Sequence, residues 1–160
     1  MDKNPSKWTG PPTYHTSKTM SRPSPGSYVI YNRVLSPNGE KLAITFNGQN
    51  NTLIVTPKND SPGQIFNLSN YDANTMFFVP QSNSGLQVAW GNAGATPMTA
   101  GLYVWTIRST PSGYTIQDGG VTQNWHLDVA DRNSLVAIAP DQGSERYRWV
   151  VEPVGNPNFQ

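Results

Sequence analysis

The feature that most constrains the fold is the regular return of short β-strand patterns, every fourth of which contains a large aromatic residue. These aromatics are Phe66, Trp105 and Trp149, and they stand 39 and 44 residues apart. Twelve stretches rich in β-branched and aromatic residues lie between turn residues, at 27–32, 41–46, 53–57, 64–68, 76–80, 86–90, 97–98, 103–107, 114–116, 124–127, 135–140 and 147–151. A period of about 40 residues indicates an internal repeat of four strands.

Three four-stranded units are too few for a β-propeller, which has four or more blades. They fit an all-β β-trefoil, a six-stranded barrel capped by three hairpins. In this arrangement the first and last strands of each unit line the barrel, and the middle two form the cap. Barrel closure also removes exposed sheet edges, which suits a chain in which only 13% of residues are charged.

Composition divides the chain into one domain and two short tails. Residues 1–25 contain five prolines among Ser, Thr and Lys and have few apolar residues, so we expect a flexible or loosely docked tail. A sharper alternative is that Trp8 and Tyr14 pack onto the domain or onto a partner. The predicted β-trefoil domain spans 26–154, and 155–160 form a C-terminal tail.

Charge and hydropathy exclude several classes of partner. The net charge is +1, whereas nucleic-acid binding needs a concentrated basic surface. No run of about 18 apolar residues is present, so we expect no membrane insertion. The N-terminus has no apolar segment after its charges and does not resemble a secretion signal. We therefore expect a soluble, cytoplasmic protein.

The side chains needed for common catalytic and metal sites are scarce. There is no cysteine, and the two histidines are His15 and His126, so nucleophilic and zinc chemistry lack their parts. A glycosidase needs two carboxylates across a cleft. Asp118, Asp128, Asp131 and Asp141 belong to the third repeat, where we expect them to lie away from the aromatic residues of the second. We predict no enzyme activity, no metal and no cofactor.

The stretch from Gln87 to Trp105 has the character of a binding site. Trp90, Tyr103 and Trp105 flank a loop of Gly, Ala and Thr, which leaves room above the rings. An aromatic face carries partial negative charge and suits the C–H face of a pyranose ring. No charged residue lies between Gln87 and Ile107. The stretch therefore predicts a shallow cleft for neutral glycans.

Several segments also resemble a known family. Residues Gln64-x-Phe66, Tyr103-x-Trp105 and Tyr147-x-Trp149 resemble a degenerate ricin-B Gln-x-Trp repeat. The sequence from Gly26 to Ala43, with Ser69–Asp72, Ala89–Gly91, Tyr103–Thr106, Gly113–Gly119 and Arg148–Val150, resembles the small inky-cap mushroom lectins in the same order. Those ricin-B-like β-trefoil lectins are toxic to nematodes and bind α1,3-fucosylated N-glycan cores. The resemblance covers residues 26 to about 154 and implies a fungal defence lectin.

The resemblance also implies a single sugar site in the second repeat. Its aromatic members fall on Tyr71, Trp90, Tyr103 and Trp105, and positions of backbone contact fall on Gly91 and Val104. Two positions depart from the family. A leucine of the family site falls on Met98 or Thr99, and an asparagine is replaced by Leu102. The implied partners are glycans or glycoproteins, fucosylated or GlcNAc-containing.

Other interpretations stay open. Trp105 aligns with Trp149, which we expect in the core, so Trp105 either contacts the ligand or belongs to the core. Tyr71 serves either the site or a turn. A second sugar site in the third repeat would use Asp118, Trp125, His126 and Asp128, but a rim histidine beside a core tryptophan is favoured. The alternative function is protease inhibition through the loops 47–51 or 141–145.

Overall fold

The computed structural model describes residues 21–155, which form twelve β-strands and two 3₁₀ helices. All twelve predicted strands are present; two keep their predicted bounds, and the bounds of the others shift by at most three residues. The strands are β1 (Gly26–Asn32), β2 (Leu42–Thr45), β3 (Ile54–Pro57), β4 (Ile65–Asn70), β5 (Met76–Pro80), β6 (Leu86–Trp90), β7 (Ala95–Thr99), β8 (Trp105–Thr110), β9 (Gly113–Asp118), β10 (Asn124–His126), β11 (Ala137–Ala139) and β12 (Trp149–Pro153). The 3₁₀ helices are η2 (Pro62–Gln64) and η3 (Glu145–Tyr147).

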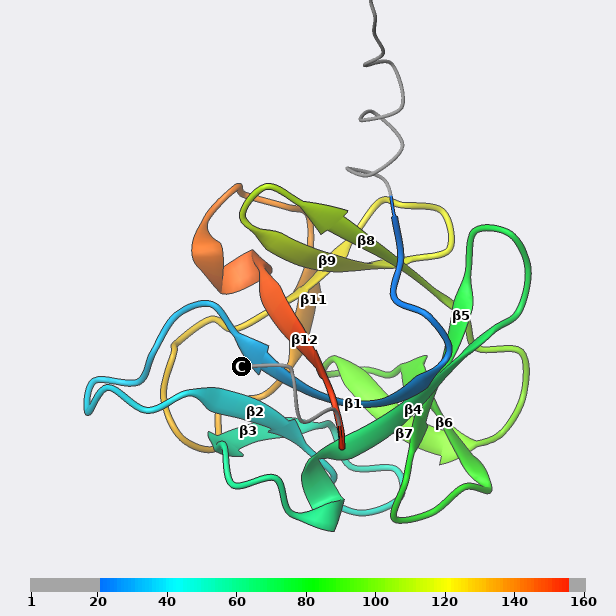
Figure 1. Ribbon diagram of the computed structural model, residues 1–160, viewed down its shortest axis with the longest axis horizontal. Helices are drawn as coiled ribbons and strands as arrows, with labels where there is room; N and C mark the ends of the chain where they lie inside the picture. The colour runs from blue at the N-terminus through cyan, green and yellow to red at the C-terminus, as the bar shows by residue number, and fades with distance from the viewer. Residues whose placement is uncertain (1–20, 156–160) are drawn as a thin grey trace, which may run out of the picture.

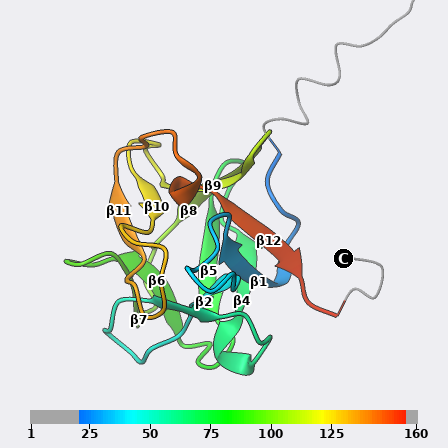
Figure 2. The ribbon, with the colours of Figure 1, turned by 90° about the vertical axis from the view of Figure 1, so that its left-hand side faces the viewer.

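Six of the strands close into a barrel. The pairings run β1–β4–β5–β8–β9–β12 and return from β12 to β1, all antiparallel. The barrel surrounds the centre of Figure 1. The other six strands form the hairpins β2–β3, β6–β7 and β10–β11. Figure 2 shows β6–β7 and β10–β11 on the side opposite β1 and β12. This architecture is the predicted β-trefoil.

The three hairpins are joined by a ring of backbone hydrogen bonds. Leu53 N–H donates to Ala95 O at 2.8 Å, Ala95 N–H to Val136 O at 3.0 Å, and Val136 N–H to Leu53 O at 2.9 Å. One residue of each repeat therefore donates to the next, which is the pattern expected at a pseudo-threefold axis. All three residues are buried, and these hydrogen bonds satisfy their backbone N–H and C=O groups without water.

The core fills the barrel and the space beneath the cap with large aromatic rings. Phe66, Phe78, Trp105, Trp125 and Trp149 are all at most 2% exposed. Trp105 and Trp125 meet edge to face, with ring centroids 4.9 Å apart. The aromatics that set the sequence period are thus the residues that fill the barrel, one from each repeat.

The third repeat corrects one expectation and confirms another. Trp125 is core, as predicted, but His126 is 4% exposed rather than a rim residue. Its ring stacks on Tyr147 of η3, with centroids 4.4 Å apart, and its Nε2 lies 2.8 Å from Asp128 Oδ1. The helix η3 covers the outer face of β10, so both faces of this short strand are buried.

Only the last residues of the predicted N-terminal tail are described, and these lie against the domain. The N–H of Ser109 donates to Ser21 O, and Arg22 Nη1 donates to the carbonyls of Asp72 and Thr75. Pro23 is buried. Trp8 and Tyr14 lie outside the described residues.

Candidate functional site

A shallow pocket of about 200 Å³ opens in the second repeat, beside the end of β6 and the segment that leads into β8. Its lining residues are Trp90, Leu102, Tyr103, Val104, Trp105 and Asp118. Three of them are exposed although they are large and apolar: Trp90 is 50% exposed, Leu102 71% and Tyr103 38%. Gathered exposed apolar side chains of this kind mark interaction sites. The pocket unites five of the eight predicted site residues.

Trp90 is held at the pocket by the tight β6–β7 hairpin that follows it. Trp90 pairs with Ala95, and the Gly91 N–H donates to Gly94 O at 2.8 Å. A side chain at residue 91 has no room, because a Cβ there would overlap Thr96, which is buried. Gly94 has φ +145° and packs against the Val136 carbonyl. The predicted small-residue loop is therefore a close-packed turn that fixes Trp90.

Tyr103 is positioned by a side chain of β6. The Oε1 of Gln87 accepts the Gly101 N–H at 3.2 Å and the Tyr103 N–H at 3.3 Å, which ties the 101–103 segment to the strand. The Tyr103 ring lies against Gly101, where an added Cβ would be 3.1 Å from the ring. Among the described residues, no hydrogen bond engages Trp90 Nε1 or the Tyr103 hydroxyl. Both polar groups are free to meet a ligand.

Trp105 belongs to the core and also supports the pocket. It is 2% exposed, and its Nε1–H donates to Val88 O at 2.8 Å. Val88 and Pro97 form a non-hydrogen-bonded pair, since the hydrogen-bonded pairs on either side include Gly91 with Gly94 and Ala100 with Gly85. The Val88 carbonyl therefore points away from β7, and the indole supplies its donor. This bond joins β8 to β6 two residues before Trp90.

The third repeat repeats this bond and so provides an internal alignment. Trp149 Nε1–H donates to Trp125 O at 3.1 Å, which makes Trp125 the counterpart of Val88. Two residues later, Leu127 becomes the counterpart of Trp90. Leu127 is fully buried whereas Trp90 is half exposed. The second repeat thus turns outward a position that the third repeat buries.

The same contrast holds at the position two residues before the repeat aromatic. Gln64 is fully buried and Tyr147 is 3% exposed, but Tyr103 is 38% exposed. Five hydrogen bonds engage the Gln64 side chain, and the His126 ring covers Tyr147. Two pseudo-equivalent positions are therefore open together only in the second repeat of the described chain.

Asp118 is a pocket residue that sequence reasoning placed elsewhere. It lies opposite Trp105 in the β8–β9 hairpin and lines the pocket, so the expectation that it lies away from the aromatic residues is wrong. Burial raises the pKa of Asp118. Hydrogen bonds from the N–H groups of Gln123 and Thr122 and from the Thr122 hydroxyl lower the pKa by more than burial raises it, so it lies below its ordinary value. The carboxylate is ionised at neutral pH and holds its own turn.

Three predicted site residues do not line the pocket. Tyr71 is 48% exposed and packs edge to face on Phe77, with centroids 5.4 Å apart. Its turn leads directly into Met76, which pairs with Trp105, so Tyr71 lies toward the pocket end of β8. Met98 pairs with Gln87 on the β6–β7 hairpin, and Gly91 supports Trp90 from behind. Ligand contact stays a prediction for these three residues, as it does for the five that line the pocket.

The comparison that decides the family is a match of the CCL2 lectin-like family to residues 26–149. The match spans more than three quarters of the chain and includes every lining residue of the pocket. This chain belongs to the CCL2 lectin-like family. The predicted resemblance to mushroom lectins is confirmed at the level of this family and of the β-trefoil fold. A comparison with curated proteins finds no match to this CCL2 lectin-like chain.

Solved structures confirm the fold. A mosquitocidal holotoxin matches with a TM-score of 0.72 and 15% identity over 81% of this chain, which spans 17% of the toxin chain. The designed threefold-symmetric protein ThreeFoil matches with a TM-score of 0.70 and 13% identity over 81% of this chain and 99% of its own. The Macrolepiota procera ricin B-like lectin, solved with lactose, matches with a TM-score of 0.65 and 14% identity over 83% of this chain and 99% of its own. At these identities the likeness concerns the fold alone.

Residues 21–155 of the CCL2 lectin-like chain contain neither a metal-binding cluster nor a membrane-spanning helix. No cluster of three or more His, Cys, Asp or Glu side chains in this part of the chain is suited to hold a metal ion. No helix in the same part is long and apolar enough to cross a membrane.

Proposed function

We propose that this protein is a non-catalytic lectin whose second-repeat pocket binds neutral glycans, in particular fucosylated or GlcNAc-containing ones. The observation that carries the proposal is the joint exposure of Trp90 and Tyr103, at positions whose counterparts in the third repeat are buried. Membership of the CCL2 lectin-like family supports carbohydrate binding in general. The choice of sugar rests on the resemblance to fucose-binding mushroom lectins.

The chemistry of the pocket suits a sugar ring. The half-exposed Trp90 indole offers a face for pyranose C–H groups, and Leu102 adds an apolar contact at the rim. The unengaged Trp90 N–H and Tyr103 hydroxyl are able to hydrogen-bond with sugar hydroxyls. Such bonds contribute about 0.5–1.5 kcal/mol each, so we expect stacking and several weak polar contacts to share the affinity.

The same pocket is poorly equipped for hydrolysis. Glycosidases place two carboxylates on opposite sides of the scissile bond. Asp118 is the one carboxylate among the described lining residues, and both of its oxygens accept hydrogen bonds from its own turn. An ionised, engaged carboxylate is not a general acid at neutral pH. We therefore propose binding without turnover.

The test is replacement of Trp90 by Ala, measured on a glycan array and by titration with the best glycan. Loss of a central aromatic contact costs about 2 kcal/mol or more, which is about a thirtyfold rise in Kd. Because Trp90 is half exposed, we expect the thermal midpoint to change by no more than about 5 °C. Val129→Ala is the control, since Val129 is 62% exposed and does not line the pocket. Unchanged glycan affinity in Trp90→Ala would contradict the proposal.

The protease-inhibitor alternative gives a different result in the same samples. An inhibitor would titrate papain or trypsin and would not elute from an immobilised glycoprotein with free sugar. The 47–51 loop proposed for that role is tied to the domain by the Asn50 N–H, which donates to Pro97 O at 2.8 Å. We favour the lectin. Within this proposal the role in fungal defence rests on family resemblance, whereas the cytoplasmic location rests on the sequence expectation alone.

A further inference from the structure

A second and larger pocket, of about 370 Å³, opens on the outer face of β8 and β9. Its lining residues are Arg108, Ser109, Thr110, Pro111, Thr115, Gln117, Val121, Asp141 and Arg148. We call it the β8–β9 pocket. It shares no lining residue with the smaller pocket beside Trp90 in the second repeat, which we call the Trp90 pocket. Its volume lies within the range of about 300–1,000 Å³ typical of small-molecule sites.

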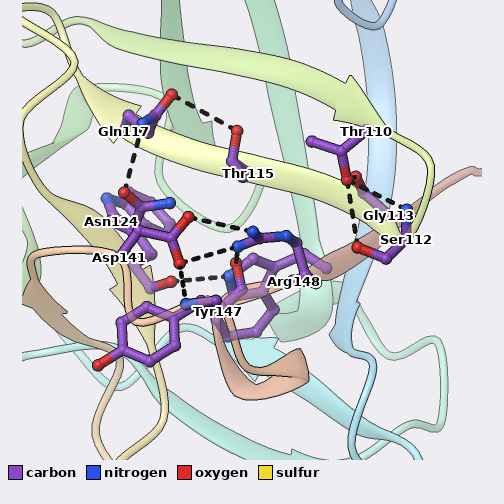
Figure 3. A network of polar contacts seen from close by, with 12 residues as sticks. Thr110, Ser112, Gly113, Thr115, Gln117, Asn124, Asp141, Tyr147 and Arg148 are labelled. Atoms are coloured by element: carbon purple, nitrogen blue, oxygen red, sulfur yellow. Dashed lines mark hydrogen bonds and ion pairs between the residues drawn. The ribbon is translucent and has the colours of Figure 1, made fainter. Parts of the chain in front are cut away.

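A polar network supports this pocket from beneath. Figure 3 shows the side chains of Thr115, Gln117, Asp141 and Arg148 gathered along one face of β9. Arg148 donates to both carboxylate oxygens of Asp141, Nη1 to Oδ1 at 3.2 Å and Nη2 to Oδ2 at 3.1 Å. Gln117 Nε2 donates to Asn124 Oδ1 at 3.3 Å. The lining side chains are therefore held in place before any ligand arrives.

Several polar atoms of this network have no partner. Thr106 Oγ1 and Asn124 Nδ2 belong to residues that are 1% exposed, and no hydrogen bond satisfies either atom in the described chain. Both residues pair with Gln117 across the sheet, so they lie beside a lining residue. Arg148 Nε, on the pocket wall, is also buried and unpartnered. Buried polar groups are nearly always satisfied, so such a cluster points to an absent polar partner.

The charges of the pocket do not cancel. Asp141 neutralises Arg148, with which it forms a two-pronged pair. No hydrogen bond or ion pair engages the half-buried Arg108 guanidinium among the described residues. Two guanidinium groups thus face one carboxylate, and Arg108 is the unpaired cation. A planar guanidinium of this kind binds a carboxylate through two parallel N–H donors.

We propose that the β8–β9 pocket is a second binding site, which takes a saccharide that carries a carboxylate group. Arg108 binds the carboxylate, and the amide and hydroxyl groups of Gln117 and Thr115 meet ring hydroxyls. Pro111 and Val121 supply apolar contacts for the C–H face of the ring. The site is distinct in chemistry from the Trp90 pocket, whose ligand is neutral and whose one carboxylate would repel an acidic sugar.

The two sites flank the same turn. Asp118 lines the Trp90 pocket, whereas Gln117 and Val121, on either side of it in sequence, line the β8–β9 pocket. On β8, Trp105 and Arg108 are three residues apart, which is about 10 Å along a strand. Each site is complete without the other, so their ligands can be tested separately.

The experiment is an NMR titration of the ¹⁵N-labelled full chain with glucuronate. Glucose serves as the same ring without the carboxylate, and acetate as the carboxylate without the ring. We expect glucuronate to shift the Gln117 side-chain amide and the Thr115 N–H, with an affinity about tenfold above that of either control. The affinity should fall with ionic strength, because Arg108 is partly exposed to solvent.

Single substitutions distinguish binding at this site from binding at the Trp90 pocket. Arg108→Gln, which removes no hydrogen bond or ion pair among the described residues, should weaken glucuronate binding about tenfold. Lys41→Gln removes the same charge from the first repeat and should have no effect, and neither should Trp90→Ala. Equal affinity for glucose and glucuronate, shifts confined to Trp90 and Tyr103, or an Arg108→Gln variant that binds like wild type would each overturn the proposal. Failure of Trp90→Ala to affect neutral glycans would leave the second site standing.

Discussion

Replacement of Trp105 by Phe tests how the core and the Trp90 pocket are coupled. Phe keeps an aromatic ring in the barrel but has no N–H for the Val88 carbonyl, which now receives the indole donor at 2.8 Å. Strand β7 cannot replace that donor, because Val88 and Pro97 form a non-hydrogen-bonded pair and the Val88 carbonyl points away from β7. The substitution therefore leaves a buried carbonyl unsatisfied and unties β8 from β6, two residues before Trp90.

The size of the effect follows from these two losses. An unsatisfied buried acceptor costs about 1–3 kcal/mol, and the smaller ring adds a cavity cost of about 1 kcal/mol. We expect the free energy of unfolding to fall by about 2–4 kcal/mol, which corresponds to a decrease of roughly 5–15 °C in Tm. A less rigid pocket should lose about 1–2 kcal/mol of binding free energy, or roughly five- to thirtyfold in Kd.

The pseudo-threefold symmetry provides a matched control in Trp149→Phe. Trp149 makes the equivalent bond to Trp125 O, at 3.1 Å, but belongs to the third repeat and does not line the Trp90 pocket. Both variants should show the same decrease in Tm by calorimetry, whereas only Trp105→Phe should weaken glycan binding in a titration. Equal glycan affinity in the two variants would refute the coupling of β8 to the pocket through the indole bond.

Two further predictions concern the turn beside Trp90 and the acid range. Gly91→Ala forces a Cβ into the buried Thr96 side chain, which should cost roughly 1–3 kcal/mol of folding free energy and lower Tm by several degrees. Glycan affinity should fall more than tenfold. Gly85→Ala, with ordinary space around its Cβ, is the control, and equal Tm values in the two variants would contradict this reasoning. Burial raises the pKa of Asp141, but the hydrogen bonds of Arg148 lower it more, so its folded pKa lies below the unfolded one. Its stabilising contribution is present above about pH 4 and is lost as the pH falls through the folded pKa. Urea denaturation at neutral pH and at pH 2–3 should show a smaller loss of stability in Asp141→Asn than in wild type, and an equal loss would exclude this role.

Much of the fold could be predicted because strand patterns and turns are local. The position of each strand followed from β-branched and aromatic runs, and the trefoil followed from their number and the spacing of Phe66, Trp105 and Trp149. Burial at the repeat motif could not be predicted in the same way. Tyr103 and Tyr147 occupy the same place in a Tyr-x-Trp motif, yet one is exposed and the other is buried under the His126 ring. That difference depends on contacts with segments distant in sequence.

The candidate site was predictable in part for the same reason. Trp90, Leu102, Tyr103, Val104 and Trp105 come from one stretch of sequence, and the structure gathers them at one pocket. Asp118 comes from the next repeat and was missed. Its place was available from the hairpin alone: the β8–β9 turn pairs Thr110 with Gly113, and counting back along both strands brings Asp118 opposite Trp105. Hairpin register fixes such cross-strand neighbours.

The three repeats together explain why the second one is suited to binding. The fold needs each repeat to fill the barrel, and Trp105 does so as fully as Trp149. Trp90 is not needed for that purpose, because Leu127 shows that the equivalent position can be sealed within the domain. A half-exposed indole leaves about 100 Å² of apolar surface in water, which forgoes about 2–3 kcal/mol of burial. On the proposed function, that free energy is recovered when a glycan covers the ring. Since Gly91 and Gln87 hold Trp90 and Tyr103 in place beforehand, little of it is lost to ordering the site.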